Sequence, residues 1–292
     1  MIGIGKGSVI LLFALLIKAV SCLPAHSQQV SYTGGAQVSF GSYYFEESTQ
    51  SFYLFNGVSI RANRFTISFQ VPFVVQSTPW VSYNTIGGLP TGGTEHGVVD
   101  RAGRGGGSGM GPGQGGNREP IILSDTTQYT RASFSDPSVN SGYRFYRSSN
   151  GMTSIYVNGQ LKVPITDPAA GYGTGSWDAG VGVSASKGLQ SRWFFSADLM
   201  HWWLGDMADM KLNNVLAYSF STGKMLSNRR WLLSSSVNGL TKVIDDFDPP
   251  VNLNFGIGLM PGDDLLINTS FSLGLTESSA DFVVGVGWLF NF

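Results

Sequence analysis

The last residues of the chain, 281–292, show the alternation that most restricts the possible fold. One set of alternate positions holds Phe282, Val284, Val286, Trp288, Phe290 and Phe292. The other set is small and mixed, with two glycines. Successive side chains of a strand point to opposite faces, so the pattern predicts a β-strand with one aromatic, apolar face. We expect this strand to be paired along its length, which a closed barrel achieves without a free edge.

This pattern resembles the C-terminal signature of bacterial outer-membrane β-barrel proteins, which end in Phe after alternating apolar or aromatic residues. The resemblance implies that Trp288, Phe290 and Phe292 are read by the barrel-assembly machinery. It also implies contact with outer-membrane lipid. The alternative interpretation of the segment is the final strand of a soluble β-sandwich.

The composition favours the membrane interpretation. Charged residues make up only 13% of the chain, against about 25% in a typical soluble domain. No stretch beyond the N-terminus reaches the run of about 20 apolar residues that a transmembrane helix needs. Low charge, 39 Gly and 19 Phe in short alternating runs are typical of a transmembrane β-barrel. The net charge of -1 argues against a nucleic-acid partner.

The N-terminus has the pattern of an export signal. Lys6 supplies positive charge, residues 9–17 form a short apolar core, and Ala25-His26-Ser27 suits cleavage before Gln28. We therefore predict a signal peptide over 1–27 and one barrel domain over 28–292. Cleavage before Cys22, with lipidation there, is the alternative, so the sequence leaves open whether Cys22 is lipidated or removed with the signal peptide.

Twelve alternating segments are predicted as strands. They are 36–45, 52–61, 64–75, 139–147, 152–163, 177–187, 192–204, 212–221, 229–240, 251–260, 264–275 and 281–292. An even number suits a bacterial barrel. Most of the connections alternate between short and long, as periplasmic turns and external loops do, although the first external connection, at about 46–51, is short. The sequence therefore predicts an all-β, antiparallel, up-and-down transmembrane barrel of about twelve strands.

The longest predicted connection, 76–137, contains a Gly-rich tract over 103–116 flanked by arginines. No Gly-x-x-x-x-Gly-Lys-Ser/Thr motif is present, and no strand-then-helix pattern flanks the tract, so a phosphate-binding loop is not indicated. We predict a long external loop. Whether it also folds into the barrel mouth as a constriction or plug is left open.

Large aromatic residues are predicted at both rims of the barrel, where amphipathic rings lie at headgroup level. Those assigned to the outer rim are Tyr44, Trp177 and Trp203, and those assigned to the inner rim are Phe65, Trp193, Trp231 and Trp288 to Phe292.

Several charged residues fall on the polar faces of the predicted strands. A charge facing lipid near the midplane costs a few kcal/mol, so these side chains are expected to line the lumen and the path of a solute. They are Arg64, Arg144, Lys162, Asp178, Arg192, Asp198 and Arg230. They either create a field that selects solutes or form ion pairs that fill the barrel. Many other inward positions are Gly, Ser or Asn, which predicts a narrow pore.

No catalytic, cofactor or metal site is predicted. Of the three His, His26 lies in the signal region, His96 in the long loop and His201 near the outer rim. A Ser-His arrangement would need a serine at the same height on a neighbouring strand. The acidic groups at 245–248 and 263–264 lack the spacing of a calcium loop and are expected to be solvated.

The C-terminal half, roughly Val139 to Phe292, resembles the family called "MetA-pathway of phenol degradation". The motifs that carry the resemblance are Leu161-Lys-Val-Pro-Ile-Thr-Asp-Pro, Gly173-Thr-Gly-Ser-Trp-Asp178, Gly180-Val-Gly-Val-Ser-Ala-Ser-Lys187, Trp203-Leu-Gly-Asp206 and Ser279-Ala-Asp-Phe-Val-Val-Gly-Val-Gly287. The resemblance implies a small, transporter-like outer-membrane barrel that passes small aromatic or hydrophobic compounds. It implies no catalytic residues.

The function predicted from the sequence is an outer-membrane channel or uptake pore for passive passage of small solutes, with no cofactor and no enzymatic activity. Three alternatives remain: a structural or surface-interaction barrel with a closed lumen, an outer-membrane hydrolase, and a secreted soluble β-sandwich. The solute, the oligomeric state and the openness of the lumen are not determined by the sequence.

Overall fold

The computed structural model describes residues 28–43, 48–78, 82–83, 90–91, 132–166, 172–206, 211–226, 230–245 and 247–292. Several sequence predictions lie outside these ranges. They are the signal peptide 1–27 with Cys22 and His26, Tyr44, His96, the Gly-rich tract 103–116 and Asp246. No helix of the described parts is long and apolar enough to cross a membrane.

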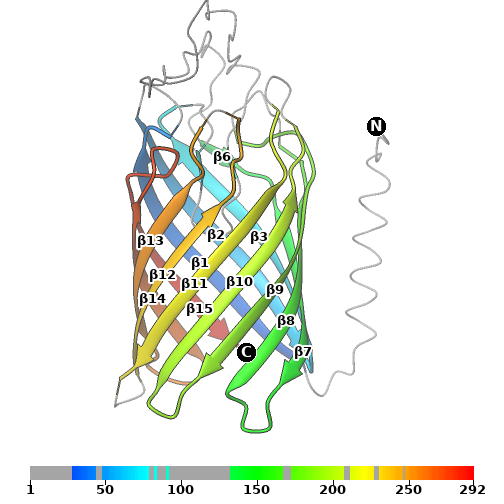
Figure 1. Cartoon of the computed structure of the whole chain (residues 1–292), viewed down its shortest axis with the longest axis vertical. Coiled ribbons are helices and arrows are strands. Elements are labelled where there is room, and N and C mark those ends of the chain that lie inside the picture. The colour runs from blue at the N-terminus through cyan, green and yellow to red at the C-terminus, as the bar shows by residue number, and fades with distance from the viewer. Residues whose placement is uncertain are drawn as a thin grey trace, which may run out of the picture.

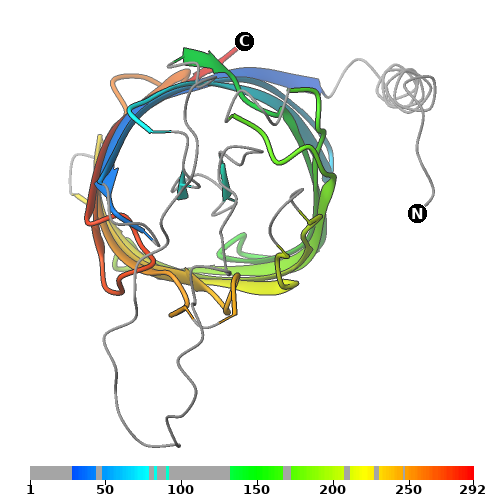
Figure 2. The same cartoon turned by 90° about the horizontal axis from the view of Figure 1, so that it is seen from above.

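Twelve antiparallel strands form a closed barrel (Figures 1 and 2). The wall strands are β1 (Gln28–Gly41), β2 (Thr49–Ala62), β3 (Phe65–Gln76), β7 (Ser138–Arg147), β8 (Thr153–Lys162), β9 (Asp178–Gly188), β10 (Trp193–Trp203), β11 (Val215–Met225), β12 (Trp231–Leu240), β13 (Val251–Leu259), β14 (Leu265–Gly274) and β15 (Phe282–Asn291). The ring closes where β15 pairs with β1, from Ser31 opposite Asn291 to Phe40 opposite Phe282. The predicted fold class and the twelve strands are thus confirmed.

The strand connections alternate between two kinds, as predicted. Short turns join β2 to β3, β7 to β8, β9 to β10, β11 to β12 and β13 to β14, all at the lower end in Figure 1. We call this the short-turn end and the opposite one the long-loop end. The turn between β2 and β3, for example, consists of Asn63 and Arg64 alone.

The predicted boundaries of two regions differ most from the structure. β1 starts at Gln28 rather than at residue 36, because Gly34 and Gly35 interrupt the apolar alternation without interrupting the pairing with β15. The predicted loop 76–137 also contains strand: β6 (Ala132–Phe134) pairs with β3 at Phe73 to Val75.

β6 and β7 together follow β3, with an irregularity between them. Gln70 of β3 faces Ser138, whereas Phe73 faces Phe134, so Val71 and Pro72 lie opposite three residues, 135–137. Ser135 still donates its backbone N–H to the carbonyl of Pro72 at 2.9 Å. The wall therefore continues across this bulge. Two further short strands, β4 (Ser82–Tyr83) and β5 (Pro90–Thr91), pair with each other and project inside the ring in Figure 2.

The outward face of the wall is apolar and the inward face is polar. Most outward positions that stay exposed are large and apolar, including Val183, Leu199, Phe220, Ile257 and Val284. Such a band can only be stable against hydrocarbon, so it faces lipid.

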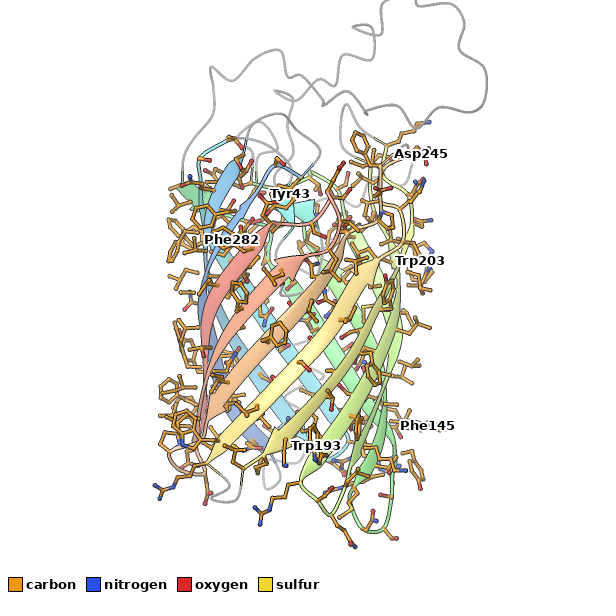
Figure 3. All side chains as sticks on the ribbon, turned by 60° about the vertical axis from the view of Figure 1, so that its left-hand side comes forward. Tyr43, Phe145, Trp193, Trp203, Asp245 and Phe282 are labelled. Carbon is orange, nitrogen blue, oxygen red and sulfur yellow. The ribbon has the colours of Figure 1, made fainter. Side chains whose placement is uncertain are left out.

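Aromatic residues flank this band (Figure 3). At the short-turn end, Phe65, Trp193, Trp231 and Phe290 lie exposed at strand ends, and Trp203 lies exposed at the long-loop end. A register shift in β7 between Arg144 and Tyr146 adds Phe145 and Tyr146 to the aromatic residues at the short-turn end, where both are exposed. Trp177 directly precedes β9 at the long-loop end. These positions agree with the predicted aromatic girdles.

Candidate solute cavity

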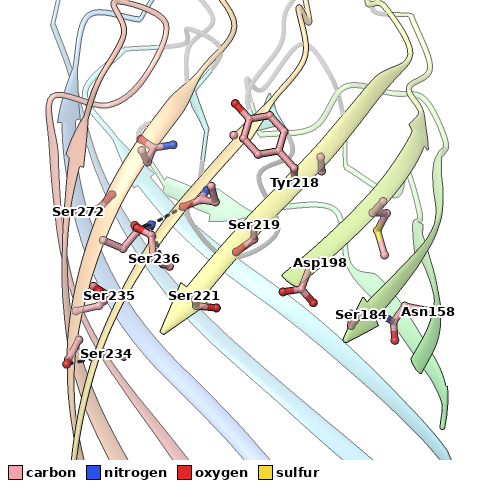
Figure 4. Close-up of a pocket in the computed structure, with 18 of the residues that line it drawn as sticks. Asn158, Ser184, Asp198, Tyr218, Ser219, Ser221, Ser234, Ser235, Ser236 and Ser272 are labelled. Carbon is pink, nitrogen blue, oxygen red and sulfur yellow. Dashed lines mark hydrogen bonds between the residues drawn. The ribbon is translucent and has the colours of Figure 1, made fainter. Parts of the chain in front are cut away.

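The barrel encloses a cavity of about 1000 Å³, lined mainly by the inward faces of β7 to β14. At mid-height its wall consists mainly of serine and asparagine side chains, with Asp198 among them (Figure 4). Neighbouring strands join through them: Asn158 donates to Ser184 at 2.6 Å, and the hydroxyls of Ser196 and Ser221 lie 2.6 Å apart. This wall offers neutral donors and acceptors to a solute.

An apolar cluster bounds the cavity at the long-loop end. Trp202, Leu240 and Val283 belong both to this cluster and to the cavity lining. Trp202 points inward from β10 and is only 2% exposed. Its indole lies over Gly180 of β9, where a β-carbon would approach the ring at 2.8 Å. Gly180, part of a motif quoted above, therefore makes room for the largest side chain of the cluster.

The opposite wall, formed by β1, β2 and β3, is largely covered on its inner side. Ser39 and Tyr53 have no exposed surface. Tyr53, Phe55 and Val74 form a second buried cluster with Tyr172, which comes from the connection between β8 and β9. That connection therefore reaches the inner face of the barrel, and the cavity lies mainly on the side of β7 to β14.

Lys162 and Asp178 form a buried ion pair, one of the two arrangements expected for the charged residues on the inward faces. The Lys162 ammonium lies 2.5 Å from Oδ2 of Asp178, with the two side chains 8% and 1% exposed. Lys162 also donates to Thr174 at 2.6 Å, and Gly205 donates its N–H to Oδ1 of Asp178 at 2.9 Å. Neither residue is among the cavity-lining residues that the structure describes. The ion pair therefore holds the two ends of the β8–β9 connection together. The bond from Gly205 links it to the start of the β10–β11 connection.

Asp136 anchors the β8–β9 connection at a second point. Its Oδ1 accepts hydrogen bonds from the N–H groups of Ile165 and Thr166, at 3.0 and 3.1 Å, and from the Thr166 hydroxyl at 2.6 Å. Ser135 donates its hydroxyl to the carbonyl of Tyr172 at 2.6 Å. Sequence reasoning assigned 135–137 to a loop and missed this role, although an Asp before Pro137 is a signal for a turn.

The four arginines predicted to line the lumen lie at its short-turn end. Arg64, Arg192 and Arg230 each directly precede a strand, β3, β10 or β12, and are exposed. Arg144 donates from Nη2 to the carbonyl of Asn63 in a turn, at 3.2 Å. None of these side chains is among the described residues that line the cavity. The four arginines thus lie at the rim rather than beside the described cavity, where a guanidinium can reach water or headgroups.

Asp198 is the predicted site residue that the structure places in the cavity wall. It lies at the middle of β10, with Ser184 of β9 and Ser219 of β11 directly opposite it in the two ladders. Figure 4 shows its carboxylate among these serines.

His201 faces outward from β10. Its neighbours across the ladders are Val181 and Leu216. Its ring packs edge-on against Trp203, with 4.7 Å between the ring centroids. No serine occupies the adjacent positions, so this histidine lacks the neighbour that a Ser-His pair requires. Among the described residues no group of His, Cys, Asp or Glu could hold a metal ion.

A closed antiparallel barrel with a lipid-facing apolar band, aromatic girdles and a polar interior defines a transmembrane β-barrel of the bacterial outer membrane. In such proteins the short turns are periplasmic and the long loops external. The chain belongs to the family described as "Putative MetA-pathway of phenol degradation", whose sequence model matches residues 62–292. The resemblance inferred from the C-terminal half is thus confirmed and extends to β3.

Solved structures with the same fold include an outer-membrane channel from Pseudomonas putida F1. It is 10% identical, with 93% of this chain and 97% of that chain covered, at a TM-score of 0.59. The NanC porin is 9% identical, with 90% and 100% covered, at a TM-score of 0.50. At these identities the likeness shows the fold. No curated protein matches the chain.

Proposed function

We propose that the protein is an outer-membrane channel for the passive passage of small solutes that combine an apolar surface with a hydrogen-bonding group. Small aromatic compounds with a hydroxyl group are solutes of this kind. The observation that carries the proposal is the order of surfaces along the cavity: apolar at Trp202 and Leu240, neutral and polar at the Ser and Asn wall, apolar again at Phe194 and Leu232.

This order suits an amphipathic solute for a physical reason. Displacing water from apolar surface is favourable, while a polar group that loses water must find another partner. A hydroxyl crossing the middle of the cavity meets Ser and Asn groups that can replace its water, and a ring crossing either end meets apolar side chains. The description of the family and the name of the Pseudomonas putida F1 channel support the same class of function.

One observation favours a second candidate, a barrel with a closed lumen that acts through its external loops. The inner faces of β1 and β2 and part of β3 are covered, and the β8–β9 connection is held inside the barrel. In that case the cavity is an enclosed space rather than a path.

Liposome swelling and planar-bilayer recordings separate the two candidates. We expect ion conductance from the folded, heat-modifiable protein, and faster swelling with a small aromatic alcohol than with a sugar of similar size. Folded protein that neither conducts nor admits either solute contradicts the channel and supports the closed barrel.

A further inference from the structure

The charge on the described lining of the cavity has the opposite sign to the summed charge of the residues assigned to the inward faces of the strands. The seven charged residues assigned to the inward faces comprise five basic and two acidic side chains, which would make the lumen positive. In the structure Lys162 and Asp178 neutralise each other. The arginines lie at the short-turn rim. Asp198 is therefore the one charged residue among the described residues that line the cavity.

Within the described parts of the chain, no positive charge lies beside Asp198 to compensate its carboxylate. The inward positions beside it on β9 are Gly182, Ser184 and Ser186, and those on β11 are Ala217, Ser219 and Ser221. No hydrogen bond or ion pair within the described parts of the chain involves Asp198, and its side chain is half-buried. A carboxylate that is partly removed from water and faces neutral groups attracts a passing cation.

The basic rim is too distant to cancel this charge. Asp198 lies five residues after Trp193, which follows Arg192 at the rim. Five residues of strand span roughly 17 Å, and strand tilt reduces this to about 13 Å along the axis. The Debye length at physiological salt is about 8 Å. The exposed rim arginines are thus largely screened from Asp198, which lies in the wall of the cavity itself.

We propose that Asp198 determines the charge preference of this channel, so that cations and cationic solutes pass in preference to anions. This inference rests on the proposed function, because charge preference has meaning only if ions pass. It adds a specificity-determining residue to the neutral Ser and Asn wall. Asp198 sets selectivity rather than the path itself, so its replacement changes which ions pass and leaves the barrel intact.

The test is the reversal potential in planar bilayers with different KCl concentrations on the two sides. We expect the wild-type protein to prefer K⁺ over Cl⁻ several-fold. Asp198→Asn and Asp198→Ser should bring the permeability ratio close to one, and Asp198→Lys should reverse the preference. Serine occupies many neighbouring inward positions, so Asp198→Ser also guards against a variant that fails to fold. Heat-modifiable mobility verifies the fold of every variant.

Two further variants make the test specific. In Asp198→Asn combined with Ser219→Asp, the carboxylate returns on the next strand at the same height, and cation preference should return with it. Asp263→Asn, which removes an exposed turn carboxylate, should leave the ratio unchanged. A wild-type channel that prefers anions, or an Asp198→Asn channel with the wild-type ratio, overturns the inference. Absence of any current from folded wild-type protein instead overturns the proposed function.

Discussion

The indole of Trp288 on β15 lies directly over Gly34 on β1, in the space that a β-carbon at position 34 would occupy. The two residues are opposite each other in the ladder that closes the barrel. The terminal aromatic strand and the glycines near the start of the chain therefore fit each other at the seam. A bulky residue at 34 and the indole at 288 cannot both keep these positions.

Replacing Gly34 should weaken the seam. Gly34→Val places a branched side chain against the Trp288 ring, and overpacking of this kind costs about 1–3 kcal/mol. We expect a lower urea midpoint for the loss of the heat-modifiable band. Trp288→Ala in the same chain should recover part of the loss, because it removes the clash. If Gly34→Val lowers the urea midpoint equally in the wild-type and Trp288→Ala backgrounds, the two residues do not interact.

Removing one partner of the Lys162–Asp178 pair should be more damaging than removing both. Lys162→Met leaves a buried carboxylate without its counter-ion, which costs about 3–5 kcal/mol. Lys162→Met combined with Asp178→Leu removes both charges and should be closer to wild type in urea unfolding. Asp178 also accepts the Gly205 N–H, so some loss remains in the double variant. A double variant less stable than Lys162→Met would contradict this account.

Removing the Asp136 carboxylate, which anchors the β8–β9 connection, should alter the current through the barrel. Asp136→Ala removes the acceptor of three hydrogen bonds from Ile165 and Thr166, so the β8–β9 connection can move inside the lumen. We expect larger fluctuations of the open-channel current than in wild type. Thr166→Val is the matched control, because it removes one of the three bonds and leaves both backbone bonds in place. Currents of Asp136→Ala that match those of the control would rule out a constraining role.

The final residue should matter for assembly more than for stability. Phe292 is 83% exposed, and its backbone N–H donates to the carbonyl of Val30 at 2.9 Å. Its side chain therefore adds little packing. Phe292→Ser should fold spontaneously in detergent like wild type but insert more slowly when the assembly machinery is supplied, whereas Phe292→Tyr should not. If Phe292→Ser inserts as fast as wild type when the assembly machinery is supplied, this residue is not an assembly signal.

The fold was predictable because a period of two assigns each residue to a face. In β13 and β14 the alternation is regular. The predicted inward residues Asn254, Asn268 and Ser270 line the cavity, and the predicted outward Phe255, Ile257 and Phe271 have large exposed surfaces. The pattern failed where glycine or proline interrupts it. Gly34 and Gly35 concealed the start of β1, and Pro137, after Asp136, concealed β6.

The site was less predictable, because alternation gives the direction of a side chain but neither its height nor its partner. Lys162 and Asp198 share the inward parity, yet Lys162 is paired at the long-loop end and Asp198 lines the cavity. The pairing of Lys162 with Asp178 depends on the register of two strands across a connection. Arg64, Arg192 and Arg230 each directly precede a strand, so alternation within a strand could not place them. Arg144 lies within β7, and its position beside the turn carbonyl of Asn63 depends on the register of β7 with its neighbour.

The central claim is that the barrel is a path for small solutes, and single-channel recording of the purified, folded protein tests it most directly. We expect discrete conductance steps in planar bilayers, and a concentration-dependent reduction of the open current by a small aromatic alcohol that occupies the cavity beside the Ser and Asn wall. Heat-modifiable protein that inserts into the bilayer and gives no conductance steps would contradict the account.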